Sequence, residues 1–199
     1  MKNWIKNIEL EGKTVKLIPL NKLHKNGLLQ AASDGKLWEL WFASVPSKEN
    51  IDKYIIKALD EKENNRGFPF VVTDKKSGEI IGSTRFCNAT PEHRRVEIGY
   101  TWYSKKSQRT GVNTECKYLL LQYAFEKLNC IAVEFRTNWF NLQSRCAISR
   151  LGAKQDGVFR NHQLNSDGSY RDTVVFSITE KEWKGVRKSL KYEMEKYDR

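Results

Sequence analysis

The segment Gln108–Glu115 has the composition of a phosphate-binding turn. It follows an apolar, strand-like stretch, contains Gly111 and leads directly into a strongly helical stretch. Unpaired backbone N–H groups and the positive end of a helix dipole meet at such a turn, and together they bind phosphate. Lys105, Lys106 and Arg109 add positive charge in or beside it. The segment therefore predicts a site for a cofactor that carries a pyrophosphate.

A carboxylate stands on the strand that precedes this turn. In the predicted strand 95–103, Glu97 lies on the polar face. The apolar face is predicted to carry Val96, Ile98, Tyr100 and Trp102. A carboxylate at this place can act as a general base. The alternative is a structural ion pair between Glu97 and one of three arginines, namely Arg94, Arg95 or Arg136.

Asn141 and Ser144 form a second polar pair at the start of a later predicted helix. Their spacing of three residues places both on one face of that helix. This arrangement favours a joint role in binding or chemistry. Both residue types are also good helix caps, so a purely structural role is the alternative.

Apolar periodicity and turn-forming residues predict the elements that position these side chains. In chain order we predict a strand at 14–18, helices at 21–33 and 47–63, a hairpin at 68–73 and 79–87, a strand at 95–103, a helix at 112–128, a strand at 131–137, a helix at 142–151, two strands around a turn at 165–169, and a helix at 180–197. In the first helix, Leu23, Leu28 and Ala31 are expected on the inner side.

The C-terminal segment is predicted to be an amphipathic helix. Thr179 and Glu182 have the spacing of a capping box. One helical stripe is apolar and consists of Trp183, Val186, Leu190, Met194 and Tyr197. We expect this stripe to pack on the domain or on a second subunit. A helix lying on a membrane is not favoured, because the polar face mixes both signs of charge.

Composition narrows the class of protein. The chain has 199 residues, a mean hydropathy of −0.66 and no apolar stretch long enough for a membrane span. The net charge is +11, but the excess of basic residues is spread evenly along the chain: 12 basic against 9 acidic in residues 1–66, 11 against 7 in 67–140, and 12 against 8 in 141–199. Such a pattern does not favour nucleic-acid binding as the main function. No apolar signal segment follows the first residues, and we expect a cytoplasmic protein.

The cysteine and histidine pattern indicates neither a metal site nor a disulfide framework. Four cysteines and three histidines are scattered without a C-x-x-C pair. Cys116 shares a predicted helix face with Val112, Leu120 and Tyr123, which favours a buried thiol. We therefore expect no bound metal.

Several motifs, in the order in which they occur, resemble those of the GNAT acyltransferases, and in particular the branch that acetylates the N-termini of ribosomal proteins. The motifs are Glu97–Trp102, Thr110–Glu115, Asn141–Arg145, Leu151–Ala153, Arg171–Ser177 and Glu182–Trp183. The resemblance implies one N-acetyltransferase domain over residues 1–199, with a core at about 12–180 and an additional C-terminal helix at about 180–197. The implied fold is α/β (α+β): a mixed, mostly antiparallel sheet whose fourth and fifth strands splay apart, with helices on both faces.

The same resemblance implies that acetyl-CoA or coenzyme A binds at the turn. Backbone donors from Arg109 to Asn113 would hold the pyrophosphate, and Lys105 or Lys106 would meet the 3′-phosphate. Asn113 stands where the superfamily usually has Gly or Ala, although this branch often has Asn. The implied cofactor-binding residues are Trp102, Tyr103, Gln108, Arg109, Thr110, Gly111, Val112, Asn113 and Asn141, the last of them for the pantetheine amides.

The resemblance also assigns the catalytic residues. Glu97 would take a proton from the attacking amine, with Asp156 as a second candidate, and Ser144 would assist the leaving thiolate. A backbone N–H near Tyr100–Tyr103 would polarise the thioester carbonyl. An α-amino group has a pKa of about 8 and a lysine about 10.4, so a chain N-terminus needs far less help from a base.

The function expected from these observations is acetyl transfer from acetyl-CoA to a primary amine, by direct attack in a ternary complex. The acceptor expected first is the N-terminal amino group of a protein or peptide, with small amines such as polyamines or aminoglycosides as alternatives. A non-catalytic module that binds RNA or ribosomes is the alternative of another class. A homodimer is possible; neither a membrane nor a nucleic-acid partner is expected, apart from a ribosomal substrate.

Overall fold

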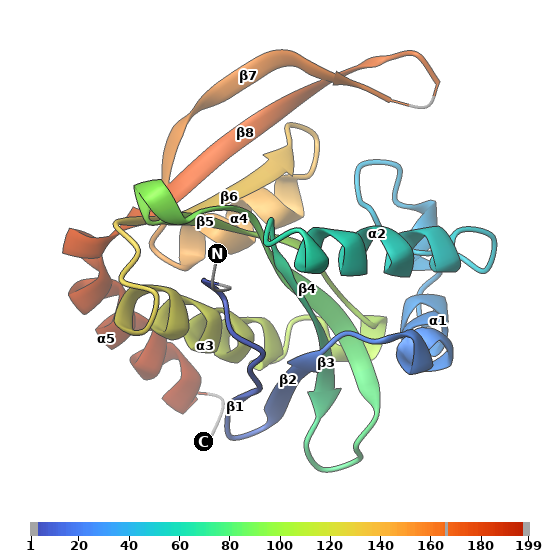
Figure 1. Cartoon of the computed structure of the whole chain (residues 1–199), viewed down its shortest axis with the longest axis horizontal. Coiled ribbons are helices and arrows are strands. Elements are labelled where there is room, and N and C mark those ends of the chain that lie inside the picture. Colours follow the sequence, from blue (N-terminus) through green and yellow to red (C-terminus); the bar gives the residue numbers. More distant parts are fainter. Residues whose placement is uncertain (1–3, 166, 197–199) are drawn as a thin grey trace.

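Eight strands form one mixed sheet in residues 4–165 and 167–196, the part of the chain that this computed structural model describes (Figure 1). The strands are β1 (Leu10–Glu11), β2 (Val15–Pro19), β3 (Phe68–Asp74), β4 (Ile80–Thr90), β5 (Arg95–Tyr103), β6 (Ala132–Asn138), β7 (Lys154–Leu164) and β8 (Tyr170–Thr179). Their order across the sheet is β1-β2-β3-β4-β5-β6-β8-β7. Neighbouring strands are antiparallel except β5 and β6, which are parallel.

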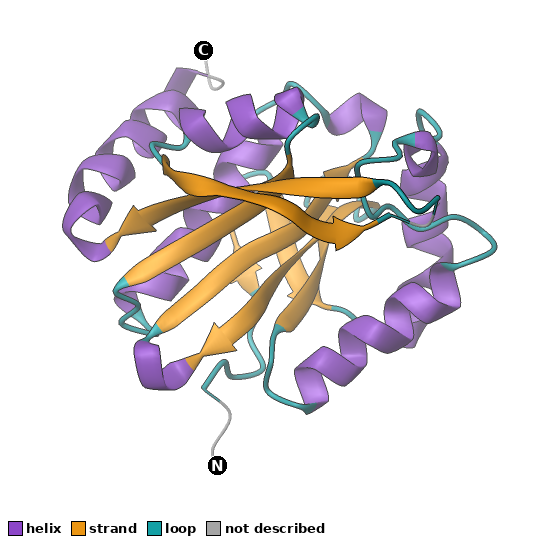
Figure 2. Ribbon diagram, turned by 90° about the horizontal axis from the view of Figure 1, so that it is seen from above, coloured by secondary structure: helices purple, strands orange, loops and turns teal. Residues whose placement is uncertain are grey.

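Helices cover both faces of this sheet (Figure 2). They are α1 (Lys25–Ser33), α2 (Ile51–Glu63), α3 (Val112–Glu126), α4 (Leu142–Arg150) and α5 (Glu180–Lys196). One apolar cluster includes residues of α3, α4 and α5, and a second cluster includes residues of α1 and α2. The predicted fold class, with helices on both faces of a mixed sheet, is confirmed.

Two predictions about the first helices are wrong. Leu23 is 91% exposed, because Asn21 caps a short 3₁₀ turn at Lys22–His24 and α1 starts only after it. A 3₁₀ turn has three residues per turn, so the register of the α-helix does not extend back to Leu23. The second helix starts at Ile51 instead of Ser47, whose carbonyl accepts the Ile51 N–H in the preceding turn.

The parallel strands β5 and β6 separate soon after they meet. Their pairing consists of Arg95–Ala132, Val96–Val133 and Glu97–Glu134 and goes no further, although β5 continues to Tyr103 and β6 to Asn138. These are the fourth and fifth of the predicted strands, since the two-residue strand β1 was not among the predictions. The expected splay between them is present, and Glu97 lies at the point where it begins.

Just after Glu97, strand β5 contains a β-bulge. Gly99 pairs with Arg85 and Trp102 pairs with Ser83, so β5 has two residues where β4 has only Thr84. Tyr100 takes up the extra length with a φ of 50°, in the left-handed region. The bulge reverses the side-chain alternation that the sequence predicted. Trp102 packs in the α1–α2 cluster and does not share a face with Val96 and Ile98, so this prediction is wrong.

The C-terminal helix packs on the domain, as its apolar stripe predicts. Trp183 stacks on Phe125 of α3 with 5.2 Å between ring centroids, and its Nε1 donates to Glu126 at 3.1 Å. Val186 and Leu190 are buried beside it. The Glu182 carboxylate accepts from the backbone N–H and the hydroxyl of Thr179, both at 2.9 Å. Tyr197, the last residue of the predicted stripe, lies outside the described residues.

We predict that Trp183→Ala lowers the free energy of unfolding by about 3 kcal/mol, because it removes a buried ring and its hydrogen bond. Urea denaturation followed by circular dichroism measures this change. Tyr192→Ala on the same helix is the matched control: Tyr192 is 60% exposed, and we expect a change below about 0.5 kcal/mol. Equal losses in the two variants would contradict the packing of α5 on α3.

Candidate active site

Helix α3 begins without a side-chain cap, and this leaves backbone donors free at its first turn. Gly111 occupies the N-cap position with a φ of −66°. Among the described residues, no hydrogen bond is formed by the backbone N–H groups of Arg109, Thr110, Gly111, Asn113 and Thr114. Free donors at the positive end of a helix fit a diphosphate, so the chemistry of this turn matches the cofactor expected there.

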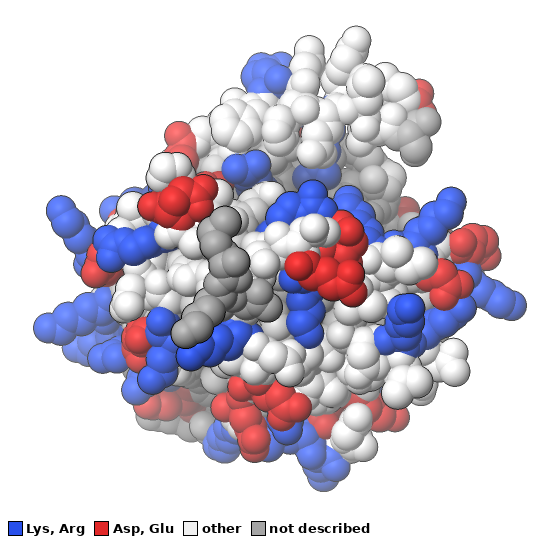
Figure 3. Space-filling model, viewed as in Figure 1, with Lys and Arg blue, Asp and Glu red and all other residues white. Residues whose placement is uncertain are grey.

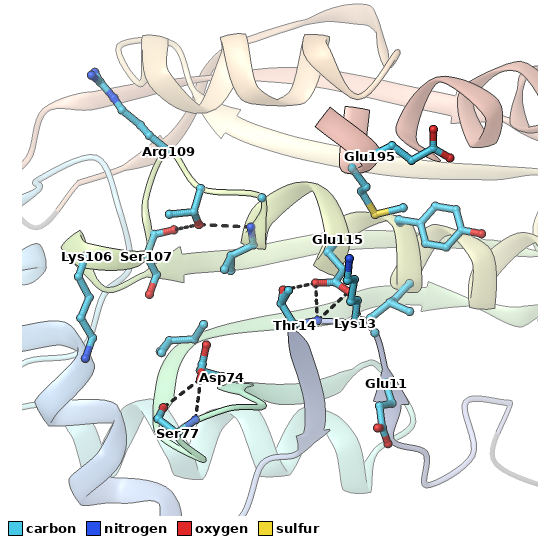
Figure 4. Close-up of a pocket in the computed structure, with 18 of the residues that line it drawn as sticks. Glu11, Lys13, Thr14, Asp74, Ser77, Lys106, Ser107, Arg109, Glu115 and Glu195 are labelled. Carbon is cyan, nitrogen blue, oxygen red and sulfur yellow. Dashed lines mark hydrogen bonds between the residues drawn. The ribbon is translucent and has the colours of Figure 1, made fainter. Parts of the chain in front are cut away.

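Local hydrogen bonds fix the conformation of the turn. The Thr110 hydroxyl donates to the Ser107 carbonyl at 2.7 Å and accepts from the Val112 N–H at 3.3 Å. The Gln108 side chain donates to the Tyr103 carbonyl at 3.0 Å. Arg109 has a φ of 60°, and its exposed side chain points away from the other labelled residues in Figure 4. The donors are therefore presented by a preformed loop.

Lys105 and Lys106 differ in whether their side-chain charge is free to meet a phosphate. Lys106 is held by Glu79, with 2.8 Å between Nζ and Oε2, and its backbone N–H donates to Asp34. Lys105 is exposed and forms no ion pair with the described residues. Of the two lysines expected near a 3′-phosphate, Lys105 is the one whose charge is not already matched by a carboxylate.

A hollow of about 1130 Å³ runs along the first turns of α3 (Figure 4). The β1–β2 turn forms part of its wall and is tied to α3 by Glu115, whose carboxylate accepts from the Thr14 backbone N–H at 3.1 Å and from the Thr14 hydroxyl. Arg109, Thr110, Gly111 and Val112 border the hollow. Glu97, Asn141 and Ser144 do not line it. The hollow therefore borders the turn expected to bind phosphate but not the residues expected to do chemistry.

Glu97 is a buried carboxylate with two polar partners on one oxygen. Its Oε2 accepts from the Asn88 amide at 2.7 Å and lies 3.4 Å from Arg136. Its Oε1 lies beside Gly99, where an added Cβ would come within 3.0 Å of it. Burial raises the pKa of Glu97, although Asn88 and Arg136 oppose the shift. A carboxylate with a raised pKa is a stronger base, and the oxygen not held by these partners is on the side toward the bulge.

Glu97 belongs to a sheet face that carries many charges and lies opposite α3. Cross-strand pairing places side chains on the same face, and Glu97 pairs with both Cys87 and Glu134. We call this surface the charged face; its charged members are Glu61 of α2, Arg85, Arg95, Glu97, Glu134, Arg136 and Arg171. Their clustering could not be predicted from spacing, because it depends on the register between distant strands.

The bulge residue Tyr100 is held against this face by a buried arginine. The Arg85 guanidinium carbon lies 4.0 Å from the centroid of the Tyr100 ring and 4.7 Å from that of Tyr54. Arg85 is 1% exposed and forms an ion pair with Glu61 at 3.1 Å. Cation–π contact of this kind stabilises the ring position. The sequence pattern did not single out Arg85 or Glu61.

A buried lysine holds the bulge from the opposite face. Lys117 of α3 donates to the hydroxyls of Thr101 at 2.5 Å and Thr84 at 3.4 Å. These two threonines lie on β5 and β4 at the bulge and also share a hydrogen bond of 2.8 Å. Burial lowers the pKa of Lys117 to about 8. The bulge is thus fixed by polar contacts on both faces of the sheet.

The polar pair Asn141 and Ser144 caps the start of α4 and, among the described residues, still has unbonded polar groups. The Asn141 side-chain oxygen accepts from the Ser144 backbone N–H at 2.9 Å, so Asn141 does cap the helix. Within the described part of the chain, the Asn141 side-chain nitrogen and the Ser144 hydroxyl form no hydrogen bond. Capping and ligand binding are therefore compatible here.

The other candidate residues have different surroundings. The Trp102 and Tyr103 side chains are buried in the two apolar clusters, and Trp102 Nε1 donates to Tyr54 at 3.2 Å. Only the backbone groups of these two residues remain for a cofactor. Asp156, the second candidate base, is exposed on β7 and accepts from Ser177 at 3.1 Å. Of the two candidate bases, Glu97 is buried and Asp156 is exposed.

The sequence pattern of the Acetyltransferase (GNAT) domain family matches residues 14–154, more than half of the chain. The chain belongs to the GNAT family. A curated relative, the uncharacterized N-acetyltransferase p20 of Bacillus licheniformis, is 27% identical over 144 residues, which cover 72% of this chain and 78% of that protein. A GCN5-related N-acetyltransferase structure from Brucella melitensis has a TM-score of 0.84 at 26% identity and covers 96% of this chain and 86% of its own.

Another GNAT structure, RimL, a ribosomal-protein alpha-N-acetyltransferase, has a TM-score of 0.76 at 16% identity, with 86% of this chain and 94% of that chain covered. This likeness shows the shared fold. As a GNAT acetyltransferase, the chain is an acyltransferase, and the GNAT fold binds acetyl-CoA or coenzyme A. No helix in the described residues is long and apolar enough to cross a membrane.

We predict that Glu97 titrates above 4.5, the ordinary value for a glutamate, because burial disfavours its charged form. Carbon-13 NMR of the carboxyl groups measures the midpoint. Glu182 is the internal control, since its contacts with Lys154 and Thr179 lower its pKa to about 2. A Glu97 midpoint at or below 4.5 would contradict the buried environment.

This shift has a consequence for stability. A carboxyl whose pKa is raised by folding stabilises the protein in its protonated form. That contribution is fully present below pH 4.5 and is lost as the pH rises through the folded pKa. The wild type should therefore lose stability relative to Glu97→Gln over this window, as measured by urea denaturation at a series of pH values.

Proposed function

We propose that this GNAT enzyme transfers the acetyl group of acetyl-CoA to the N-terminal amino group of a protein or peptide. The observation that supports this most is the position of Glu97. It is a buried carboxylate with a raised pKa, placed where β5 and β6 part and where the backbone of β5 bulges. A base at such an opening can receive an amine from one face while the cofactor approaches from the other.

The turn before α3 would hold the cofactor. Its free backbone N–H groups, those from Arg109 to Thr114 other than Val112, would bind the pyrophosphate, and the exposed Lys105 would meet the 3′-phosphate. The free side-chain nitrogen of Asn141 is suited to a pantetheine carbonyl. Acetyl-CoA bound in this way supplies the activated acetyl group.

Glu97 would take the proton that the attacking amine has to lose. An α-amino group has a pKa of about 8, so a carboxylate of raised pKa is a sufficient base, directly or through water. Asn88 and Arg136 hold one oxygen of Glu97 in place, and the other, which lies beside Gly99 and the Cys87 thiol, would take the proton. A backbone N–H of the segment Tyr100–Tyr103 would polarise the carbonyl.

Ser144 would assist the departing thiolate. Its hydroxyl forms no hydrogen bond within the described residues and belongs to the first turn of α4. The N-terminal end of a helix favours negative charge, so both the helix and the hydroxyl would stabilise the thiolate. A thiol pKa of about 8.5 makes the demand on this residue small.

The proposal places the chain in the branch that acetylates the N-termini of ribosomal proteins. Its support is the likeness of fold to RimL together with the motifs around Glu97 and Asn141. The proposal includes a cytoplasmic location, which agrees with four free cysteines. On the side drawn in Figure 3, basic and acidic side chains are interleaved, which does not favour the alternative of an RNA-binding module.

An acceptor screen tests the proposed function. The full chain is mixed with acetyl-CoA and with peptides of free N-terminus, polyamines or aminoglycosides, and the release of free thiol is measured. We expect turnover with peptides and little or none with the same peptides after N-terminal blocking. Turnover with polyamines alone would reject the protein N-terminus as acceptor.

We predict that Gly111→Glu abolishes coenzyme A binding, because it places a negative charge and a side chain among the phosphate donors. Isothermal titration calorimetry with coenzyme A measures this loss. Gly185→Glu is the matched control, since it adds the same charge on α5, where an added Cβ meets nothing within 4 Å. Retained affinity in Gly111→Glu would mean that the phosphates bind elsewhere.

We predict that Glu97→Gln lowers kcat by about 100-fold with little change in the affinity for coenzyme A, because it removes the base and keeps the shape. The acidic limb of the pH profile of kcat/KM should disappear with it. Asp156→Asn is the comparison that separates the two candidate bases. A loss confined to Asp156→Asn would assign the proton transfer to Asp156 instead.

A further inference from the structure

Three of the four arginines on the charged face are neutralised by carboxylates. Arg85 forms an ion pair with Glu61 at 3.1 Å. Arg95 and Arg136 both bind Glu134, at 2.8 Å and 3.0 Å. The face thus supplies a carboxylate to each of these guanidinium groups.

Arg171 of β8 is the exception. Among the described residues it forms neither an ion pair nor a hydrogen bond, and its Nε is closed off from solvent. Burial lowers its pKa, while Tyr100 and Glu97 act in the opposite direction through charge. Glu97 is the last residue of β5 that pairs with β6, and Tyr100 lies in the splayed part beyond it, so the Arg171 guanidinium lies within electrostatic reach of the candidate base.

The register of β8 explains this position. Thr173 pairs with Asn138, which is the last residue of β6, so Arg171 lies two residues beyond the end of that strand. On its other side Arg171 pairs with Gln163 of β7. In the described sheet no strand stands between β8 and β5 at this level, and the Arg171 side chain borders the opening between β5 and β6.

A partly buried guanidinium without an anion is costly, since buried charges are normally paired. We propose that Arg171 binds a carboxylate of the acetyl acceptor, so that the acceptor is a primary amine with a carboxylate a few bonds from its nitrogen. Arginine suits this task because its planar fork binds a carboxylate with two parallel hydrogen bonds. This inference rests on the proposed acetyl transfer at Glu97 and adds the class of acceptor.

The charges on the face complement such an acceptor. Its ammonium group meets Glu97, and its carboxylate meets Arg171. A polyamine has no anion for Arg171, and its further ammonium groups would approach Arg136 and Lys57, the latter lying 5.9 Å from the centroid of the Tyr100 ring. Two sources offer the required chemistry: the α-carboxylate of a free amino acid, and an Asp or Glu side chain in the first residues of a peptide.

The experiment compares matched acceptors with the full chain and saturating acetyl-CoA. One pair consists of peptides that begin Ser-Glu and Ser-Gln and are otherwise identical, and the other consists of alanine and alaninamide. Thiol release gives kcat and KM for each acceptor. The peptide pair reports on a side-chain carboxylate, and the amino-acid pair reports on an α-carboxylate, so the two sources are distinguished.

Arg171→Gln should lower kcat/KM about tenfold or more for the carboxylate member of the preferred pair and less than about twofold for its amide partner. The loss should appear in KM rather than in kcat, because the contact is made away from the reacting atoms. Arg171→Lys should restore part of the preference. Arg160→Gln on β7 is the control: Arg160 is exposed and pairs with Asp172, and the preference should not change.

Equal kcat/KM for both members of both pairs in the wild type would overturn the carboxylate subsite. An Arg171→Gln variant that keeps the wild-type preference would overturn it as well. If that variant does not fold, the wild-type comparison and Arg171→Lys still test whether the carboxylate subsite exists. Absence of thiol release with every amine is a different result, since it would reject the proposed reaction itself.

Discussion

The site depends on one backbone distortion, the bulge at Tyr100. A tyrosine with a φ of 50° is uncommon, and such a conformation costs on the order of 1–3 kcal/mol. Two buried cations hold it. Arg85 packs on the ring of Tyr100 from one face of the sheet, and Lys117 donates to Thr101 from the other. Neither cation would be buried in this sheet without such partners, so the bulge and its buried charges require each other.

The bulge has two structural consequences. First, it follows the last residue pair between β5 and β6, so the strand bends away where Glu97 is placed and the sheet opens at this point. Second, it moves Trp102 to the α1–α2 side, where its indole binds Tyr54. Tyr54 also contacts Arg85, so the same ring links the bulge to α2. The opening between β5 and β6 and the adjoining packing of Trp102 on α2 therefore depend on the same set of contacts.

Features set by local chemistry could be predicted from the sequence. The glycine turn at Gly111, the Asn141 cap and the apolar stripe of α5 each depend on residues close in the chain, and each is present. The bulge could not be predicted, because Tyr100 occupies a position where a left-handed backbone usually calls for glycine. A strict alternation was assumed for β5, and this placed Trp102 on the wrong face.

The charged face was missed for a different reason. Arg85 and Arg136 are far apart in the sequence and reach this face through strand register, and Glu61 reaches it from α2 through its ion pair with Arg85. Arg171 was noticed as part of a motif, but its lack of a partner becomes visible only when every neighbouring carboxylate is assigned. Long-range pairing of charges has no periodicity, so it leaves no pattern in the sequence.

The two faces of the opening differ in their chemistry, and this difference suits a reaction between two ligands. At the start of α3 the donors are neutral backbone N–H groups, which bind phosphate without offering a competing titratable group. On the opposite face the groups are charged and mostly neutralise one another, and Glu97 and Arg171 border the opening. Under the proposed function, a polyanionic cofactor and a charged amine would thereby be kept on separate sides of the sheet. They would meet only where β5 and β6 part, so the splay that begins at Glu97 would determine where transfer takes place.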